Sequence, residues 1–478
     1  MSKQAIYKKY YTDEQTKNLE MGIYAYGPPK GPRFKIEGMR VFSDNPEHDF
    51  RTVERYKEYK DCGFNMMLTQ VSGQYYGECA WEDSVAKRCM DKYLQAGITK
   101  TILLDERIRK LSTELDGCIG EGKRFASQDE LDAWVADCMK DYQYHPAFYG
   151  IQFCDEPRWR CFKTFGQLWK AVKKACPKAF IQCNLWGLFF QFVTETFPPY
   201  GKSNTFEGRF KEYMHMFLDE TGADYIMLDR YGLFTSEETG LYPYHFLNAQ
   251  LMNEVAKERG IKKLMLCVQS FAQRQRGVQT HRLPTEAEMH LQIHAMLGAG
   301  IKEIAYYTYW SGGDYLGVGE YRDNGWAIVA TDGTKTYLYP VVQKLNGMIK
   351  KLSPVIMNFD HVADTYAVKP PFQSKPMHLQ HTKRGKLTHA KVSASQEVAM
   401  LFELKDEKRD NWLYVLQNVT CPKFGAHLPP QTSIVTFTNP AWTKVDVFDG
   451  DEWHTEDLVN GTYTTTLNNG HAVYLMPY

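Results

Sequence analysis

The chain has 478 residues, of which 43% are hydrophobic, 14% aromatic and 24% charged, a composition typical of a globular protein whose length favours two domains. Lysine and arginine total 57, as do aspartate and glutamate, so the formal net charge is zero. No basic field exists that would attract a phosphate backbone, and we therefore expect no nucleic-acid partner.

The N-terminal segment and the cysteines together predict the cellular compartment of the protein. MSKQAIYKKYYTDEQTKNLEMG lacks the apolar core of a signal peptide, and the longest apolar stretch, IQCNLWGLFFQFV, is too short to cross a bilayer. The 11 cysteines are scattered without a C-x-x-C pair, and several fall in predicted strands, such as Cys154, Cys183 and Cys267. This pattern predicts buried free thiols in a reducing compartment. We expect a cytoplasmic protein without a membrane partner, unless a signal segment has been removed ahead of this N-terminus.

From about residue 20 to residue 352, short apolar runs alternate with longer amphipathic segments. The runs predict strands at 21–29, 64–70, 98–106, 148–157, 179–186, 224–232, 263–271 and 302–310. The amphipathic segments predict helices at 50–62, 84–96, 128–143, 163–176, 207–221, 243–259, 285–299 and 336–352. In QAGI, ERGI and GAGI a glycine follows a helix just before the next strand, as in a left-handed helix cap.

Near-continuous apolar strands separated by helices predict an α/β fold with a parallel sheet covered by helices. Eight strand–helix units favour closure into a (β/α)8 TIM barrel, which we place at residues 1–355. An open doubly wound sheet is the alternative. It would carry a G-x-G-x-x-G phosphate loop after the first strand, whereas this chain has AYGPPKGP there.

After about residue 360 the pattern changes to short strands separated by Pro, Asn, Asp and Gly. The strand segments are QEVAMLFEL, NWLYVLQNVT, SIVTFTN, KVDVFDG and GHAVYLMPY. We therefore predict a C-terminal all-β sandwich domain at residues 360–478.

Active sites of such barrels lie at the carboxyl ends of the strands. Here the predicted strands end in acids, amides and aromatic side chains, and none ends in histidine. These residues are Asp105, Glu106, Asp155, Glu156, Asn184, Trp186, Asp229, Arg230, Tyr231, Gln269, Tyr306, Tyr307, Tyr309 and Trp310. The set predicts acid–base chemistry on a neutral polyol, with no metal or organic cofactor.

The segment FYGIQFCDEPRWR places Asp155 and Glu156 at the end of a buried strand, where acids are costly unless they are used or paired. Alternation along the strand turns Glu156 into the barrel and Asp155 outward. Glu156 is therefore our first candidate for the catalytic acid. The alternative is that it only pairs with Arg158 or Arg230.

The second acid of the pair is less specified by the sequence. Asp229 is the first candidate, as a nucleophile, as a base that activates water, or as a group that holds substrate hydroxyls. Asp105, Glu106 and Glu320 are reserve candidates. The separation of the two carboxyl groups decides the stereochemistry, at about 5–5.5 Å for a retaining enzyme and about 6.5–9.5 Å for an inverting one.

Three segments together resemble (β/α)8-barrel glycoside hydrolases. GIQFCDEP resembles the strand-four motif in which the glutamate before proline is the general acid/base. PTEAEMHLQIHAMLGAGIKEIAYYTYW resembles the segment from helix seven to strand eight, and NGWAIVATDGTKTYLYPVVQKLNGMIKKLSPVI resembles the stretch that leaves the barrel. The resemblance spans about residues 20–478, and it implies a glycosidase with an accessory β-sandwich.

One position departs from this pattern. The large retaining clan has a nucleophilic glutamate at the end of strand seven, whereas this chain has Gln269 there, and an amide cannot form the glycosyl ester. The resemblance then pairs Glu156 with the strand-six Asp229. The same departure makes a catalytically inactive carbohydrate-binding barrel the main alternative. A sugar-acid lyase or isomerase ranks third, because the mouth shows neither a metal-ligand set nor a catalytic lysine.

We thus predict a glycosidase with Glu156 as general acid or acid/base and Asp229 as nucleophile or base. The predicted substrate-binding residues are Asp155, Asn184, Trp186, Tyr231, Gln269, Tyr307, Trp310, Asp105 and Glu320. We expect a carbohydrate substrate, and the neutral, aromatic-rich chain permits a homo-oligomer. His290 and His294 in HLQIH have a metal-binding spacing, but the glutamate of H-E-x-x-H is missing, and we expect surface or packing histidines.

Overall fold

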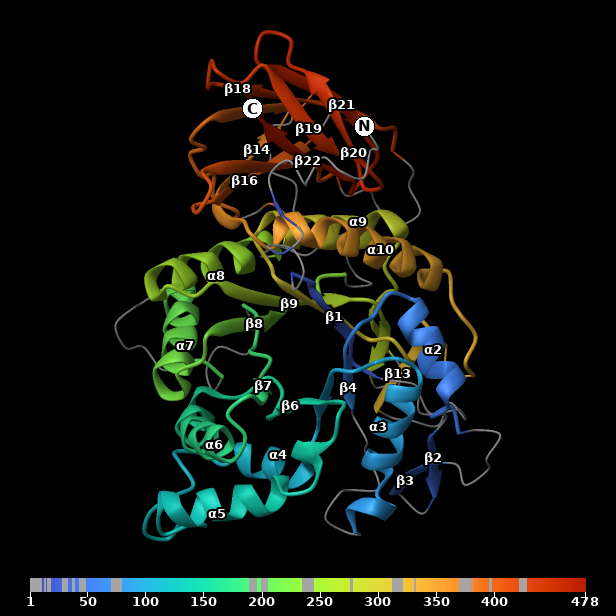
Figure 1. The fold of residues 1–478 in the computed structure, drawn as a ribbon, viewed down its shortest axis with the longest axis vertical. Helices are drawn as coiled ribbons and strands as arrows, with labels where there is room; N and C mark the ends of the chain where they lie inside the picture. Colours follow the sequence, from blue (N-terminus) through green and yellow to red (C-terminus); the bar gives the residue numbers. More distant parts are fainter. Residues whose placement is uncertain are drawn as a thin grey trace.

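The computed structural model describes residues 11–12, 14, 19–27, 33–36, 39–42, 49–69, 80–188, 196–198, 205–233, 245–275, 278–311, 321–330, 332–368, 379, 381–394, 398–420 and 428–478. Figure 1 shows a body of parallel strands and helices and, beyond α9 and α10, a set of antiparallel strands that contains the C-terminus. The mixed α/β class with a separate all-β region is as the sequence predicts.

The body contains two four-stranded parallel sheets. In spatial order the first sheet contains β1 (Gly22–Ala25), β12 (Glu303–Tyr307), β9 (Lys263–Gln269) and β8 (Tyr225–Asp229). The second contains β4 (Met67–Thr69), β5 (Thr101–Leu103), β6 (Phe148–Gln152) and β7 (Phe180–Gln182). Each of the eight predicted strands is present, and nearly all of their residues are buried.

Backbone hydrogen bonds join these two sheets at both of their edges. On the β7 side, the Leu185 N–H donates to the Met227 carbonyl over 3.0 Å, and Leu185 forms a parallel bridge with Leu228. On the β1 side, the Asn65 N–H donates to the Ile23 carbonyl over 3.0 Å. The carboxyl ends of β6, β7 and β8 therefore lie next to one another, although β7 and β8 belong to different sheets.

Helices follow the strands in the predicted order. Their bounds are α2 Val53–Asp61, α3 Val85–Gln95, α4 Glu106–Ser112, α5 Gln128–Met139, α6 Phe162–Ala175, α7 Phe206–Thr221, α8 His245–Arg259, α9 Glu286–Gly298 and α10 Leu338–Ile356. The predicted left-handed caps are confirmed at Gly97, Gly260 and Gly300, which have φ values of 78°, 68° and 81°. Helix α4 was not expected from the sequence; the Asp105 side chain caps its first turn by accepting from the Arg107 N–H.

The chain after residue 360 forms a six-stranded and a three-stranded antiparallel sheet. The first has the order β14 (Asp360–Val368), β16 (Val398–Asp406), β17 (Asn411–Asn418), β22 (Ala472–Pro477), β19 (Lys444–Phe448) and β20 (Trp453–Asp457). The second has the order β15 (Ala390–Ala394), β18 (Gln431–Phe437) and β21 (Thr462–Leu467). An apolar cluster draws on both sheets, with Leu401 and Leu416 from one and Val435 from the other.

Helix α9 connects the two parts of the molecule. It contacts β9 of the body as well as β16 and β17 of the six-stranded sheet, and nearly all its side chains are buried. Because the helix is covered by both parts of the molecule, its polar residues Glu288, His290, Gln292 and His294 are buried together with its apolar ones. A second apolar cluster accordingly runs from the body into the six-stranded sheet.

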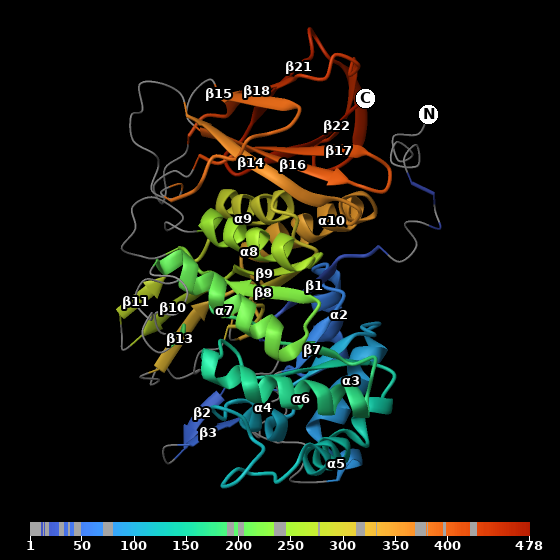
Figure 2. The same ribbon diagram turned by 90° about the vertical axis from the view of Figure 1, so that its left-hand side faces the viewer.

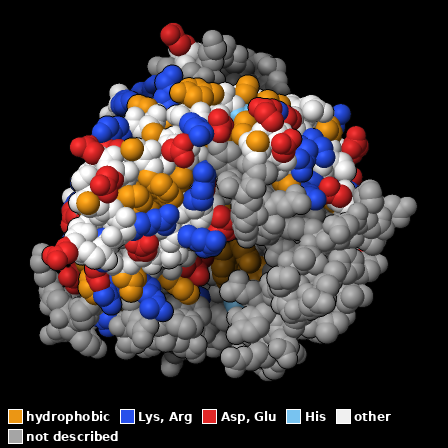
Figure 3. All heavy atoms as spheres, turned by 90° about the horizontal axis from the view of Figure 1, so that it is seen from below, with side chains coloured by type: hydrophobic (Ala, Val, Ile, Leu, Met, Phe, Trp, Pro, Cys, Tyr) orange, Lys and Arg blue, Asp and Glu red, His pale blue; other side chains and the backbone are white. Residues whose placement is uncertain are grey.

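Shorter strands occur in the connections after β1, β9 and β12. These are β2 (Arg33–Ile36), β3 (Met39–Phe42), β10 (Ala272–Gln275), β11 (Val278–His281) and β13 (Tyr321–Trp326), all on one side of the molecule in Figure 2. They follow the carboxyl ends of parallel strands, so this side carries the candidate site. Along the described residues, no helix is both long enough and apolar enough to cross a membrane. On the described part of the face in Figure 3, acidic and basic side chains are interspersed.

Candidate active site

Glu156 lies just beyond β6 and is held by the neighbouring strand. The Phe153 N–H donates to the Gln182 carbonyl, and the Glu156 N–H donates to the Asn184 carbonyl, both over 2.9 Å. Glu156 has a φ of 49°, in the left-handed region that residues other than glycine rarely adopt. Such conformations persist only where the surroundings hold them, and they are concentrated at functional sites.

Asp229 ends β8 and is 5% exposed. Its carboxylate accepts a hydrogen bond from Asn184 Nδ2 over 2.9 Å and further bonds from the Glu156 carboxyl, the Tyr231 side chain and the Gly187 N–H. Burial raises the pKa of Asp229 above its usual value, and these hydrogen bonds oppose that shift. A glycine is needed at 187, since a Cβ there would lie 2.1 Å from the Asp229 carbonyl oxygen.

The structure thus brings Glu156 and Asp229 together. Because two carboxyl groups that share a hydrogen bond must hold at least one proton, they do not both ionise. Asn184 donates to Asp229, which favours the charged form of that carboxyl, whereas burial favours its neutral form. The pair is therefore suited to hold one proton and one negative charge between its two groups.

Asp155 points inward, contrary to the prediction from strand alternation. Its Oδ1 accepts from Asn184 Nδ2 over 3.1 Å, and after burial its charge is the largest influence that raises the pKa of Tyr26. The reason is that β6 ends at Gln152, so the period of two no longer applies three residues later. Asn184 therefore bridges the carboxylates of Asp155 and Asp229.

Three buried amides lie at the ends of β6 and β7. Gln152, Gln182 and Asn184 are at most 2% exposed, and the carbonyl oxygen of each side chain has no hydrogen-bond partner among the described residues. Gln182 Nε2 donates to the Tyr26 hydroxyl over 2.7 Å, which fixes the orientation of that amide. Buried acceptors without partners are costly, so these oxygens are suited to donors from a ligand or from water.

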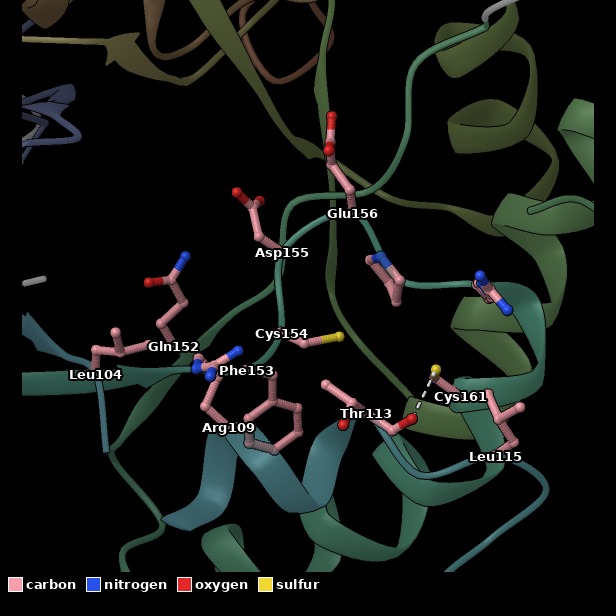
Figure 4. A pocket seen from close by; sticks show the side chains of 12 residues that line it. Leu104, Arg109, Thr113, Leu115, Gln152, Phe153, Cys154, Asp155, Glu156 and Cys161 are labelled. Atoms are coloured by element: carbon pink, nitrogen blue, oxygen red, sulfur yellow. Dashed lines mark hydrogen bonds between the residues drawn. The ribbon is translucent and has the colours of Figure 1, made fainter. Parts of the chain in front are cut away.

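A pocket of about 550 Å³ opens beside the acids (Figure 4). Its walls come from the end of β5, from α4 and the residues that follow it, and from the segment after β6. The lining residues are Leu104, Arg109, Thr113, Leu115, Gln152, Phe153, Cys154, Asp155, Glu156, Pro157, Arg158 and Cys161. The lining residues from α4 and beyond it, Arg109 and Thr113 among them, were missed from the sequence. The Asp105 cap followed by Ile108 and Leu111 was the available signal for this helix.

Tyr213 of α7 supports the acid-bearing segment from behind. Its hydroxyl donates to the Pro157 carbonyl over 2.6 Å and accepts from the Trp186 N–H. It therefore ties the residue after Glu156 to the segment after β7. Trp186 itself is partly buried.

Aromatic rings gather at the carboxyl ends of β8 and β12. Tyr231 and Tyr307 are partly buried, with ring centroids 5.5 Å apart, and Tyr307 also packs against Phe271 at 5.0 Å and Tyr26 at 5.8 Å. Tyr231 also influences the pKa of Asp229, so this side chain lies close to that acid.

Gln269 has a structural role in this conformation. Its Nε2 donates to the carbonyls of Leu233, Phe271 and Arg282, and its Oε1 accepts from the Leu233 N–H over 2.9 Å. The amide is 0% exposed and binds two connecting segments together. We therefore do not retain it among the substrate-binding residues.

Two other residues that were predicted to bind substrate, Asp105 and Trp310, contact other parts of the protein instead. The Asp105 carboxylate forms an ion pair with Arg107 at 2.7 Å and accepts from the Tyr142 hydroxyl, and its side chain is 0% exposed. Trp310 is 1% exposed and packs against Phe50 at 5.1 Å, so it does not present a face to a sugar. Glu320 lies outside the described residues.

The expected packing role of His290 and His294 is confirmed. Both are buried, His290 Nδ1 lies 3.3 Å from His294 Nε2, and His294 Nδ1 lies 2.8 Å from the Tyr474 hydroxyl. Their helix, α9, contacts the six-stranded sheet and does not face the pocket. Over the described residues, no group of three or more His, Cys, Asp and Glu side chains is arranged to hold a metal ion.

No protein-family model matches the chain, and no curated protein sequence matches it. Among solved structures, the chain is similar to an α-amylase from Anoxybacillus, with a TM-score of 0.50 and 12% identity over 96% of this chain and 98% of that one. It is also similar to a glucosidase from Croceicoccus marinus, with a TM-score of 0.46 and 9% identity over 96% and 95% of the two chains. The first similarity confirms, at the level of the fold, the resemblance to glycoside hydrolases.

Proposed function

We propose that this protein is a glycoside hydrolase whose two parallel sheets form one (β/α)8 barrel at residues 1–355. The hydrogen bonds that join the sheets at both edges support this closure, as does the fold shared with the Anoxybacillus α-amylase. The two antiparallel sheets of residues 360–478 are then an accessory β-sandwich.

The contact between Glu156 and Asp229 carries the proposal. Glu156 is the acid that protonates the departing glycosidic oxygen, and Asp229 is the carboxylate that attacks the anomeric carbon. The electrostatic interaction between the two carboxyl groups supports the narrow spacing of a retaining enzyme over the wide spacing of an inverting one. Substrate binding would replace the hydrogen bond between them, and Glu156 would then act as the base for the incoming water.

The surroundings of this pair suit a polyhydroxylated ligand. The unpartnered amide oxygens of Gln152, Gln182 and Asn184 accept hydrogen bonds, as sugar hydroxyls require. Tyr231 and Tyr307 combine ring faces with hydroxyls, a combination that fits the mixed surface of a sugar ring. We therefore propose a carbohydrate substrate with these residues, Asp155 and Trp186 in contact with it.

Glu156→Gln tests this proposal, with turnover measured on a panel of aryl glycosides and oligosaccharides. We expect kcat to fall about 100- to 10,000-fold while calorimetry still detects ligand binding, because only the transferable proton is lost. Glu106→Gln is the matched control, since Glu106 follows the neighbouring strand β5 but is ion-paired with Arg109 at 2.7 Å. It should keep most of the turnover.

Full activity of the Glu156→Gln protein on a substrate that the wild type cleaves would overturn the assignment. If the wild type binds oligosaccharides in calorimetry but releases no sugar from any member of the panel, the inactive carbohydrate-binding protein is the correct description.

A further inference from the structure

Two cysteines lie on either side of the acid-bearing segment and line the same pocket. Cys154 directly precedes Asp155, and Cys161 follows six residues after it. Both thiols contact the C-terminal end of α4, with Cys154 Sγ 4.0 Å from the Ser112 carbonyl and Cys161 Sγ 3.7 Å from the Thr113 carbonyl. Figure 4 shows the Cys154 sulfur directed toward Cys161.

From this geometry we propose that Cys154 and Cys161 are a redox-active dithiol, which a hydroperoxide that enters the pocket converts into a disulfide. The bond would close a covalent loop around residues 155–160 and thereby restrain Glu156. The formation of this disulfide does not depend on the proposed function, whereas its effect on hydrolysis does.

Cys161 is the thiol suited to react first. It is the N-cap of the 14-residue helix α6, and its side chain makes no capping hydrogen bond there. The positive end of a helix and nearby cations favour a thiolate. The interaction with Cys154 is the largest influence that lowers the pKa of the Cys161 thiol, and Arg158 lowers it further.

The steps balance as a two-electron oxidation of the two thiols. The Cys161 thiolate attacks one oxygen of the hydroperoxide, the O–O bond breaks, and an alcohol leaves after protonation, so that Cys161 becomes a sulfenic acid. The Cys154 thiol then attacks this sulfur, the S–O bond breaks, and water leaves as the S–S bond forms. The hydroperoxide is thereby reduced to an alcohol and water.

Cys183 is the nearest competing thiol and provides the control. Its Sγ lies 3.9 Å from the Cys154 carbonyl, but it is 0% exposed and is not among the residues that line the pocket. A hydroperoxide in the pocket therefore meets Cys154 and Cys161 but not Cys183.

Peptide mapping of the full-length protein tests the proposal. Trypsin cleaves after Arg158 and Arg160, so the three cysteines fall in separate peptides, 141–158, 161–163 and 179–202. After treatment with one equivalent of tert-butyl hydroperoxide and blocking of free thiols, we expect peptides 141–158 and 161–163 to be joined and to separate on reduction. Cys161→Ser should abolish the joined pair, and Cys183→Ser should preserve it.

A disulfide to peptide 179–202, or oxidation without any linkage, would overturn the proposal. The peptide map of the wild-type protein alone shows which cysteines are joined, even if a cysteine variant fails to fold. Hydrogen exchange should slow in residues 155–160 after oxidation, and hydrolysis should fall at least about tenfold and return with dithiothreitol. If the disulfide forms but the reduced protein hydrolyses no glycoside, the proposed function fails and the dithiol stands.

Discussion

Asn184 donates its side-chain amide to Asp229 over 2.9 Å, although Asn184 follows β7 and Asp229 ends β8, two strands of different sheets. The same nitrogen lies 3.1 Å from Asp155. One neutral donor therefore connects the buried carboxylate of Asp229 with the exposed carboxylate of Asp155. The arrangement orients the Asp229 carboxylate toward Glu156 and lessens its repulsion from Asp155.

Asn184→Ala should lower kcat about 100-fold with a smaller effect on KM, because it removes a donor that orients the reacting carboxylate. Steady-state kinetics on the best substrate of the panel check this expectation. Asn358→Ala is a suitable control, since among the described residues that amide donates to carbonyls of its own turn, those of Pro354 and Val355. Equal losses in the two variants would argue against a role for Asn184 in the site.

Asp229→Asn should abolish hydrolysis and make the protein more stable at neutral pH, by about 1 kcal/mol. A carboxyl whose folded-state pKa is raised binds its proton more tightly when folded, so its ionisation destabilises the fold as pH rises through that pKa. The gain should therefore shrink as pH falls toward about 4, where the carboxyl is neutral in both states. Denaturant unfolding at several pH values measures this difference, and a less stable variant at pH 7 would contradict the expectation.

Acidification should weaken the contact between α9 and the C-terminal sheets. Burial lowers the pKa of His290 to about 3 and also lowers the pKa of His294 and His471 from 6.5. The unfolded chain then binds more protons than the folded chain below about pH 6.5, and the stability that neutral His290 contributes is lost progressively from there toward about pH 3, at about 1.4 kcal/mol per pH unit. His294 and His471 add to this loss in the same direction.

Unfolding of the wild type and of His294→Gln between about pH 7 and pH 5 checks this expectation, and the variant should show the shallower dependence. Tyr474→Phe is the control. It removes the hydroxyl that lies 2.8 Å from His294 but no titrating histidine, so it should lower stability and leave the slope unchanged. Identical slopes for wild type and His294→Gln would rule out this histidine as the source.

The buried ion pair of Arg282 and Glu288 should contribute strongly to the fold beside the site. Their side chains are 7% and 3% exposed, and Glu288 also completes a capping box with Thr285. Glu288→Gln keeps the capping geometry but leaves Arg282 without its counter-charge, so we expect a loss of about 3–5 kcal/mol in the free energy of unfolding. Asp137→Asn removes an exposed pair with Lys140 and should change little. Equal effects of the two changes would contradict this interpretation.

Much of the body could be predicted from local pattern alone. The eight strands and the helices that follow them were expected because their apolar period and their capping residues are local properties, as at Gly97 and Gly260. The short strands β2, β10 and β13 were not expected. They pair only with one another or with neighbours in the connecting segments, and such pairing is not encoded in the period of one short stretch.

The sequence by itself determined which side chains end the parallel strands, and therefore that Glu156, Asn184 and Asp229 come from neighbouring strand ends. Only the tertiary structure decided how each one is used. Asp155 points inward because its strand ends at Gln152, before the acid is reached. Gln269 is hydrogen-bonded to backbone groups of distant segments. The physical reason is that periodicity specifies a residue's place along an element, whereas burial and hydrogen-bond partners depend on segments far away in the chain.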